Sequence, residues 1–479
     1  MFSKQASWFD AWDINAYVSY IRYAERHGSL MLENTYTTIP HTPVFVFQYY
    51  TFLGLINRLL HLDPFLLFHL ASILTTALLA TLCFFIAKTF IPPKDRLLMT
   101  TTIIFGGGLG WIPFLEMKSA DMVTPDFTFI KPFTIGHDAL SISLSLLSIL
   151  LFYLYSQKKK ILTLIIAILA GFGAGVFHPY KLLWLVIIGL VWAIKEKKKF
   201  SNLLLYPLGL IILFAVYYPI GLTPFIKNPG LAGVWGESFT SANLFSIILG
   251  FGLWTPFIIW KLLIGEAKTE AERFIKLCFM SQLLLLFTPL PYSRQFIPAM
   301  YALGSLFGYF AIKELITSPR YRSLALTILV IASTVSMLHV FKFLTFDVKP
   351  TNHYFYLLSS EEQALKFINT LPKESNILSL YRLGNVIPAF SDNKVFFGHF
   401  MQTPNSEKTL KIAQRFYLYD NETDQRQFLK DNHIDYIYYG LEEAYLRKSQ
   451  NLLIDNPYPY FPIIYQNDSI IIYDTAPKS

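Results

Sequence analysis

Ten apolar segments follow one another between residues 64 and 345, and they constrain the fold more than any other feature. Each is long enough, or nearly long enough, to cross about 30 Å of hydrocarbon as a helix. A hydrophobic fraction of 53% with only 15% charged residues agrees with this interpretation. The sequence therefore predicts an α-helical polytopic membrane protein with about ten spans. The predicted spans are 64–87, 97–115, 138–155, 161–177, 179–194, 202–221, 243–264, 274–290, 296–312 and 323–345.

Lysine and arginine residues lie mostly in alternate short loops between these segments. One set of loops holds 17 of them, and the opposite set holds 5. Because cytoplasmic loops carry the excess of positive charge, the first set is predicted to be cytoplasmic. Residues 1–63 and the tail 346–479 then lie on the outer side of the plasma membrane.

The stretch 42–64 leaves an alternative open, because it is apolar enough to cross the bilayer. If it crossed, the residues before it would lie in the cytoplasm. Arg58, His61 and Asp63 crowd its end, and the next span begins at once. We therefore expect a helix that lies on the outer leaflet.

The tail 346–479 differs in kind, since it is polar and has no run long enough to span. Residues 361–372 predict an amphipathic helix, and 375–381 and 435–440 predict short buried strands. A closing hairpin is expected with its turn at Asn467-Asp468, after two helices that fill 406–431. The chain is thus predicted to have three parts. These are a first loop (1–63), a helical bundle (64–345) and a small extracytoplasmic α/β domain (346–479).

Glycines and net charge do not indicate a nucleotide or nucleic-acid site. No glycine fingerprint follows any predicted strand of the tail. The glycines of "FGGGLGW" (105–111) fall inside a predicted span, where close helix packing is the expected role. The net charge of +8 resides in short loops and forms no basic face, so we expect a bilayer, and no nucleic acid, as partner.

Asp10 and Asp13 begin an amphipathic stretch near the N-terminus, on one helical face with Tyr17 and Tyr20. Acids at a helix start commonly act as caps and dipole partners. On the outer face of a membrane bundle they have a second interpretation. A carboxylate there can accept a proton from an attacking hydroxyl or bind a divalent cation.

His137 and Asp138 lie at the mouth of a predicted span, in the outer loop 116–138. In the structural interpretation, Asp138 caps the helix and His137 has no functional role. The functional alternative for both residues is a metal ligand or an acid/base group, and both are also candidate residues for binding the substrate. Asp10, Asp13 and His137 are the candidate metal ligands of the sequence.

Two short outer turns supply candidate phosphate-binding residues. "GVFHPYKLLW" (175–184) contains His178, Tyr180 and Lys181 between two spans, and "PLPYSRQFIP" (289–298) contains Arg294. In the structural interpretation, the proline makes the turn and the lysine side chain extends to the membrane interface. In the functional interpretation, these polar residues bind an anionic lipid headgroup, because polar groups at this depth are costly unless they face a cavity or a partner.

The order of these features resembles the GT-C membrane glycosyltransferases, near the bacterial protein-mannosyltransferase and arabinose-transferase type. "FDAWDINAYVSYIRYAERHGSLMLENTYT" (9–37) is similar to the family's first outer loop, with an acidic motif and a Tyr-rich helix. The stretch from "TPVFVFQYY" onward is similar to the proline-led interfacial helix and span that follow. "GGGLGW", "HPYK", "PYSRQF" and the tail's "GHFMQTPN" also resemble a bacterial subgroup.

The resemblance implies an inverting transfer of a sugar from a polyprenyl-phosphate donor to a glycan, lipid or protein. It gives the role of catalytic base to an acid of the first loop, so Asp10 is the first choice and Asp13 the second. It also implies a divalent cation, Mg or Mn, in some members. Members of the family have a spanning helix before the acidic loop, and the sequence leads us to expect that this helix is missing here.

Two other classes of function stay open from the sequence. A lipid or polysaccharide transporter predicts internal repeats, and no convincing repeat is visible, although "LGFGLWTPF" is interrupted by glycine and proline. A non-catalytic relative is the other alternative.

Overall fold

The computed structural model describes residues 11–124, 127–129, 133, 135–228, 243–289, 293–343, 356–419, 421–452 and 456–475. The chain divides into two compact units. The first contains the described residues up to 68, residues 218–228 and the tail from 356 onward. The second contains residues 69–217 and 243–343.

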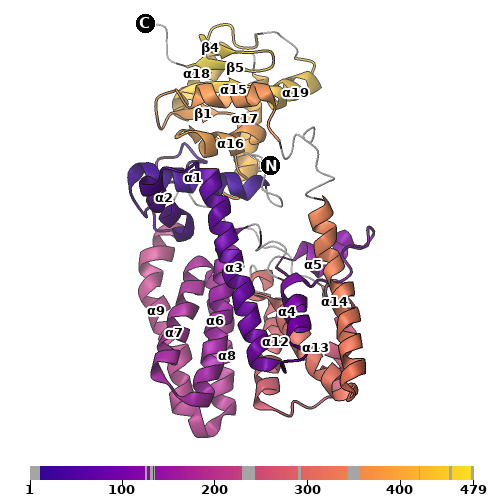
Figure 1. The fold of residues 1–479 in the computed structure, drawn as a ribbon. Helices are drawn as coiled ribbons and strands as arrows, with labels where there is room; N and C mark the ends of the chain where they lie inside the picture. Colours follow the sequence, from indigo (N-terminus) through magenta and orange to yellow (C-terminus); the bar gives the residue numbers. More distant parts are fainter. Residues whose placement is uncertain are drawn as a thin grey trace. The chain divides into compact units, whose positions relative to one another are not determined.

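The second unit is helical, because most of its residues belong to long apolar runs whose backbone groups are bonded within each helix. Its helices include α6, α7 and α8, which lie side by side (Figure 1). The bounds are α3 Pro64–Phe90, α4 Arg96–Phe105, η1 Glu116–Lys118, α5 Ala120–Val123, α6 Gly136–Lys158, α7 Ile161–Phe177, α8 Pro179–Lys195, η2 Lys197–Lys199, α9 Phe200–Lys227, α10 Leu244–Phe251, η3 Gly252–Trp254, α11 Thr255–Leu263, α12 Glu270–Leu286, η4 Ser293–Phe296, α13 Met300–Leu315 and α14 Pro319–Lys342.

Helices occur at all ten positions where the sequence predicts a span. Among the described residues, five helical stretches are long and apolar enough to cross a membrane. They are Pro64–Phe90, Gly136–Lys158, Phe200–Pro224, Leu244–Leu263 and Pro319–Lys342. The other predicted spans correspond to helices of 10 to 17 residues. A mostly helical fold is therefore confirmed, and the number of ten spans stays a prediction.

Helices α6 and α7 approach closely through small side chains. Ser148 Oγ donates to the Ala167 carbonyl across the helix pair at 2.7 Å, and Ser141 Oγ donates to the Ala174 carbonyl at 3.1 Å. A Cβ added to Gly171 would lie 2.7 Å from Ser148 Oγ, so the helices touch there only because this residue is glycine. Such contacts are typical of helix pairs in membranes.

The glycine-rich segment after α4 is not helical, and this corrects the predicted span 97–115. The helix ends at Phe105, and the following backbone bonds to other parts of the chain. The Gly107 N–H donates to the Ser333 carbonyl at 2.8 Å, and the Gly108 N–H donates to Asp121 Oδ2 at 2.7 Å. Glycine has a low helix propensity, and these bonds replace those of a helix. The predicted close packing does occur, since a Cβ on Gly108 would lie 2.0 Å from the Leu249 carbonyl.

The first unit joins two N-terminal helices to a mixed sheet with helices around it. The sheet order is β2-β1-β3-β5-β4, with β1 parallel to β2 and β3, and β5 antiparallel to β3 and β4. The bounds are α1 Ala11–His27, α2 Gln48–Leu60, α15 Ser359–Ile368, β1 Asn376–Leu378, α16 Tyr381–Phe390, β2 Lys394–Val395, α17 Ser406–Leu418, α18 Glu422–Asp431, β3 Tyr436–Tyr439, α19 Leu441–Ser449, β4 Ile463–Gln466 and β5 Ile471–Asp474.

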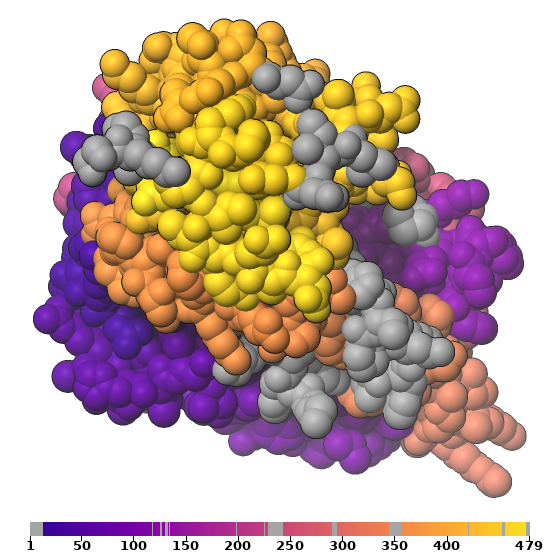
Figure 2. Space-filling model, turned by 90° about the horizontal axis from the view of Figure 1, so that it is seen from above, coloured from indigo at the N-terminus to yellow at the C-terminus, as the bar shows by residue number. Residues whose placement is uncertain are grey.

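The predicted elements of the tail are confirmed. The amphipathic helix is α15, the two strands are β1 and β3, the helix pair is α17 and α18, and the hairpin is β4–β5. In the space-filling view, the orange and yellow atoms of the tail form one continuous mass (Figure 2). Helix α2 has 13 residues and is about 20 Å long, which is too short to cross the hydrocarbon.

The start of the chain folds onto the tail. Helix α1 packs against α16, and the Val395 N–H of edge strand β2 donates to the Thr35 carbonyl at 3.0 Å. Tyr36, fully buried, donates from its hydroxyl to the Asn385 carbonyl at 2.9 Å. Residues from opposite ends of the sequence thus share one hydrogen-bonded structure.

Candidate functional site

Asp13 lies in the first turn of α1, where its negative charge faces the positive end of the helix dipole. This position agrees with the structural alternative from the sequence, in which an acid at a helix start interacts with the helix dipole. Asp13 also contacts a distant part of the chain, because its Oδ1 atom lies 3.1 Å from Nε2 of His399 in the tail. The other predicted acid, Asp10, lies outside the described residues.

Tyrosine side chains surround this part of α1. Tyr17 stacks on Tyr50 with ring centroids 4.3 Å apart, and its hydroxyl lies 3.5 Å from Asp13 Oδ2. Burial raises the pKa of Tyr20 well above its usual range, and it also raises the pKa of Tyr36. Both phenols are therefore neutral at pH 7. The Asp13 carboxylate, with its side chain 24% exposed, is next to uncharged groups on this side.

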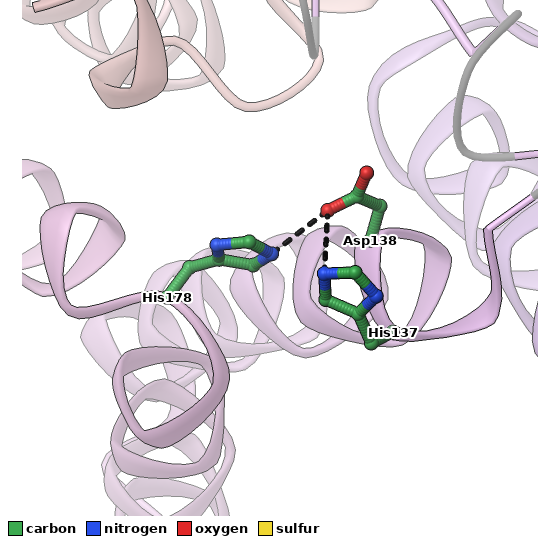
Figure 3. Close-up of side chains that lie close together, drawn as sticks. All are labelled: His137, Asp138 and His178. Carbon is green, nitrogen blue, oxygen red and sulfur yellow. Dashed lines mark hydrogen bonds and ion pairs between the residues drawn. The ribbon is translucent and has the colours of Figure 1, made fainter. Parts of the chain in front are cut away.

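His137, Asp138 and His178 form a cluster in the second unit (Figure 3). His137 and Asp138 begin α6, and His178 is the residue between α7 and α8. Asp138 Oδ1 lies 2.8 Å from His178 Nε2 and 3.4 Å from His137 Nε2. The two imidazole rings are stacked, with centroids 5.0 Å apart.

The packing of α6 on α7 explains why these residues meet. The bond from Ser141 to the Ala174 carbonyl joins the two helices about one turn from Asp138 and one turn from His178. Pro179 then begins α8, which stops α7 from continuing and turns the chain at His178. The sequence predicted both ends of this contact as separate candidates, and the structure brings them together.

The donor set of this cluster is suited to a divalent metal ion. One ligand atom from each residue lies within 4.8 Å of the other two. Ligands at about 2.0–2.1 Å from a tetrahedral ion are about 3.3 Å apart, and the two contacts of Asp138 here are 2.8 and 3.4 Å. Two imidazoles and one carboxylate form a set that transition metals favour, whereas Mg²⁺ prefers oxygen ligands. The cluster joins His137, a predicted metal candidate, to Asp138, predicted as a metal ligand or acid/base group, and to His178, predicted as a phosphate-binding residue.

Lys181 and Tyr180 lie in the first turn of α8, next to His178. Lys181 is fully buried, and its charge adds to the positive end of the α8 dipole. Tyr180 packs edge-on against Phe296 with centroids 6.0 Å apart, which brings helix η4 against α8. Arg294 belongs to η4, and its side chain lies outside the described residues. This end of α8 is therefore suited to an anionic ligand.

His399 was not predicted from the sequence as a site residue. It lies in the segment "GHFMQTPN", whose resemblance to other proteins was visible but suggested no role. Its side chain is only 1% exposed and contacts the predicted acid Asp13. Nothing in local sequence pattern links residues so far apart.

No protein-family model matches the sequence, and no curated protein matches it either. Solved structures do match it in fold. The oligosaccharyltransferase of Archaeoglobus fulgidus, tethered with an acceptor peptide that contains the NVT sequon, matches with a TM-score of 0.57 and 12% identity. The match covers 99% of this chain and 71% of that one.

ArnT from Cupriavidus metallidurans, bound to undecaprenyl phosphate, matches with a TM-score of 0.55 and 12% identity over 98% of this chain and 96% of that one. Both structures are GT-C glycosyltransferases. The chain has the GT-C fold. A further GT-C structure, the Archaeoglobus fulgidus enzyme in complex with Zn and sulfate, matches with a TM-score of 0.55 and 11% identity over 97% of this chain and 69% of that one. The predicted resemblance to the GT-C group is thus confirmed at the level of the fold.

Proposed function

We propose that this protein transfers one sugar from a polyprenyl-phosphate donor to an extracytoplasmic acceptor, with inversion at the anomeric carbon. The observation that carries the proposal is the GT-C fold, shared over 98% of the chain with an enzyme solved with undecaprenyl phosphate. The acceptor is a glycan, a lipid or a protein. The protein spans the plasma membrane, with the first loop and the tail on the outer side, in line with the distribution of lysine and arginine.

Asp13 is the proposed general base, with Asp10 as the other candidate. In this step the acceptor O–H bond breaks and its proton moves to the carboxylate. The acceptor oxygen bonds to the anomeric carbon from the side opposite the phosphate. The bond from that carbon to the phosphate oxygen breaks, and its electron pair leaves on the polyprenyl phosphate. A partly exposed carboxylate beside tyrosine side chains supports this role, since solutes can reach its oxygens.

His178, Tyr180, Lys181 and Arg294 are the proposed residues for the donor phosphate. Lys181, at the start of α8, supplies positive charge to the phosphate oxygens as the leaving group gains negative charge. The Tyr180 hydroxyl would donate a hydrogen bond to the same group. These interactions strengthen as the bond breaks, so they lower the barrier rather than only bind the donor.

A divalent cation is proposed at His137, Asp138 and His178. When bound, it would supply positive charge for the phosphate group. The two imidazoles favour Mn²⁺ or Zn²⁺ over Mg²⁺. Asp138 orients both rings through the contacts of its Oδ1 atom.

The test uses the full chain in lipid nanodiscs, with undecaprenyl-phosphate-linked hexoses and pentoses as donors. Asp13→Asn should reduce transfer by about 100- to 10,000-fold if Asp13 is the base, since general bases commonly contribute this much. Asp10→Asn tests the other acid in the same way. Asp424→Asn, an exposed acid of α18, is the matched control and should keep full activity. If both Asp13→Asn and Asp10→Asn retain normal transfer, the proposed base is wrong.

Metal binding has a separate test that does not require turnover. His178→Ala should weaken Mn²⁺ or Zn²⁺ binding by about 100-fold or more in calorimetric titrations, because even outer-shell changes cost 10–100-fold. His339→Ala, on α14, serves as the control histidine. Equal affinities in the two variants would contradict a metal site at this cluster.

A further inference from the structure

His399 comes from the loop between β2 and α17, and its contact with Asp13 joins the tail to the acidic helix. The imidazole is 1% exposed, while the Asp13 side chain is 24% exposed. Nε2 lies 3.1 Å from Asp13 Oδ1. A buried ring thus lies against one oxygen of a carboxylate that solvent still reaches.

The backbone fixes which nitrogen of His399 carries the proton. The Met401 N–H donates to Nδ1 at 3.0 Å, so Nδ1 must be the acceptor nitrogen. In a neutral imidazole the proton is then on Nε2, which lies 3.1 Å from Asp13 Oδ1 without an aligned hydrogen bond in this structure. Catalytic hydrogen bonds are often poorly aligned without substrate and tighten in the complex. The edge of the Tyr36 ring packs against the imidazole with centroids 5.6 Å apart. Ring position and tautomer are both determined by groups that do not react.

Other bonds hold the N-terminal segment on the tail without this contact. Asn34 Nδ2 donates to the Gln402 carbonyl at 2.7 Å, and Thr403 Oγ1 donates to the Tyr36 carbonyl at 3.1 Å. The Val395 N–H donates to the Thr35 carbonyl at 3.0 Å. Docking therefore does not depend on His399, and its contact with the carboxylate requires another explanation.

We propose that His399 is a positioning residue that orients the Asp13 carboxylate for proton transfer. This inference rests on the proposed function, because Asp13 is its base. In the substrate complex Nε2–H aligns on Oδ1, and the acceptor proton is transferred to Oδ2, the oxygen that His399 does not contact. The imidazole keeps its own proton throughout. The tail is thereby part of the reaction site, since it supplies a side chain that fixes the geometry of the base.

The test compares two variants of the full chain in the nanodisc assay. His399→Ala should lower kcat by about 10- to 100-fold with the donor KM unchanged, since misplacement of a reacting group by about 1 Å costs on this order. His399→Gln, whose amide Nε2 is also a donor, should recover most of kcat. His433→Ala, a histidine of the tail away from Asp13, is the control. If His399→Ala keeps wild-type kcat, or if the Ala and Gln variants lose it equally, the positioning role is wrong.

A spectroscopic measurement separates this failure from failure of the proposed function. In ¹⁵N spectra of histidine-labelled protein, the resonances lost in His399→Gln should belong to an Nε2-protonated ring. They should shift in Asp13→Asn, whether or not sugar is transferred. An unchanged His399 spectrum in Asp13→Asn would overturn the contact itself. An active Asp13→Asn variant with a shifted spectrum would instead overturn the base assignment and leave the contact intact.

Discussion

Two aspartates of this protein, Asp13 and Asp138, each lie against an imidazole. The nearest distances are 3.1 Å to His399 and 2.8 Å to His178. Asp138 and His178 share a hydrogen bond, whereas Asp13 and His399 lie in contact without an aligned one. At the scale of single residues, an imidazole ring thus restricts where each carboxylate can lie.

A third acid, Glu443 of α19, is buried for a structural reason. Its oxygens accept bonds from the Leu380 N–H at 2.7 Å and the Gly440 N–H at 3.0 Å. Burial, followed by the charge of Glu442, raises the pKa of Glu443 to about 8. The carboxyl group thus joins the ends of parallel strands β1 and β3 at a cost that depends on pH.

Glu443 predicts that the tail is less stable at high pH. The unfolded pKa is about 4.3, so between about pH 4 and pH 8 the folded state binds the proton more tightly than the unfolded state does. Stability therefore falls as the pH rises through this window and levels off above it. Hydrogen exchange of β1 and β3 amides in the full chain, corrected for intrinsic rates, should show this fall. Glu443→Gln should flatten the dependence, and an unchanged slope in that variant would contradict the assignment.

Candidate residues were predictable where the residue type and its position in the chain were sufficient to suggest a role. Asp13, His137 and His178 follow from polar residues next to apolar spans, and their types suggested acid/base or metal roles. His399 was not predictable, because its significance depends on a contact between distant segments. The contact between His178 and Asp138 was not predictable either, because it depends on how α6 packs on α7.

At the scale of elements, backbone contacts explain where regular structure stops. Helix α4 ends where the Gly107 and Gly108 N–H groups find partners on α14 and at Asp121. The hydropathy of residues 97–115 gave no sign of this end, because apolar residues on both sides of the glycines suit a helix equally well. By contrast, the hairpin β4–β5 followed directly from its alternating pattern and turn residues.

Gly108→Ala should destabilise the second unit. The added methyl would lie 2.0 Å from the Leu249 carbonyl and 2.5 Å from the Gly250 carbonyl, so backbone must move. Overpacking of this kind typically costs about 1–3 kcal/mol. Thermal unfolding in detergent, followed by tryptophan fluorescence, should show a lower Tm than in Gly173→Ala. The nearest atom to a Cβ at Gly173 is the flexible end of Leu144, at 3.2 Å. Equal Tm values would show that the glycine segment can relax freely.

A buried ion pair connects α14 to the start of α4. Arg322 Nε lies 3.0 Å from Asp95 Oδ2, and the Tyr309 hydroxyl donates to the same oxygen at 2.8 Å. Arg322→Ala leaves Asp95 buried without its cation, which typically costs 3–5 kcal/mol. The variant should unfold at a markedly lower temperature, and Arg322→Ala combined with Asp95→Asn should recover part of the loss. Arg320→Ala, an exposed neighbour, should have little effect. A loss no greater than in that control would contradict the account.

At the scale of the whole molecule, the two ends of the described chain belong to one compact unit. Arg22 of α1 lies 3.5 Å from Asp392, and Arg26 lies 3.3 Å from Glu374. A small pocket lies among these charged side chains. Hydropathy separated the bundle from the tail, but it could not show that the first loop folds with the tail.

Removal of residues 346–479 should expose the N-terminal helices. Arg22 and Arg26 lose their acidic partners in the truncated chain, and the buried face of α1 loses α16. Limited trypsin digestion should cleave after both arginines much faster than in the full chain. Cleavage in the 197–199 lysine run provides the reference rate, because it lies in the other unit. Unaltered protection of both arginines would mean that α1 is stable without the tail.

The contact between Asp13 and His399 has a consequence for biosynthesis. A ribosome releases Asp13 first, and His399 emerges only after the hydrophobic helices have been made. A nascent polypeptide therefore carries the acid long before its imidazole partner exists. Under the proposed function, full activity is acquired only near the end of translation, so an incompletely synthesised chain would consume lipid-linked sugar more slowly.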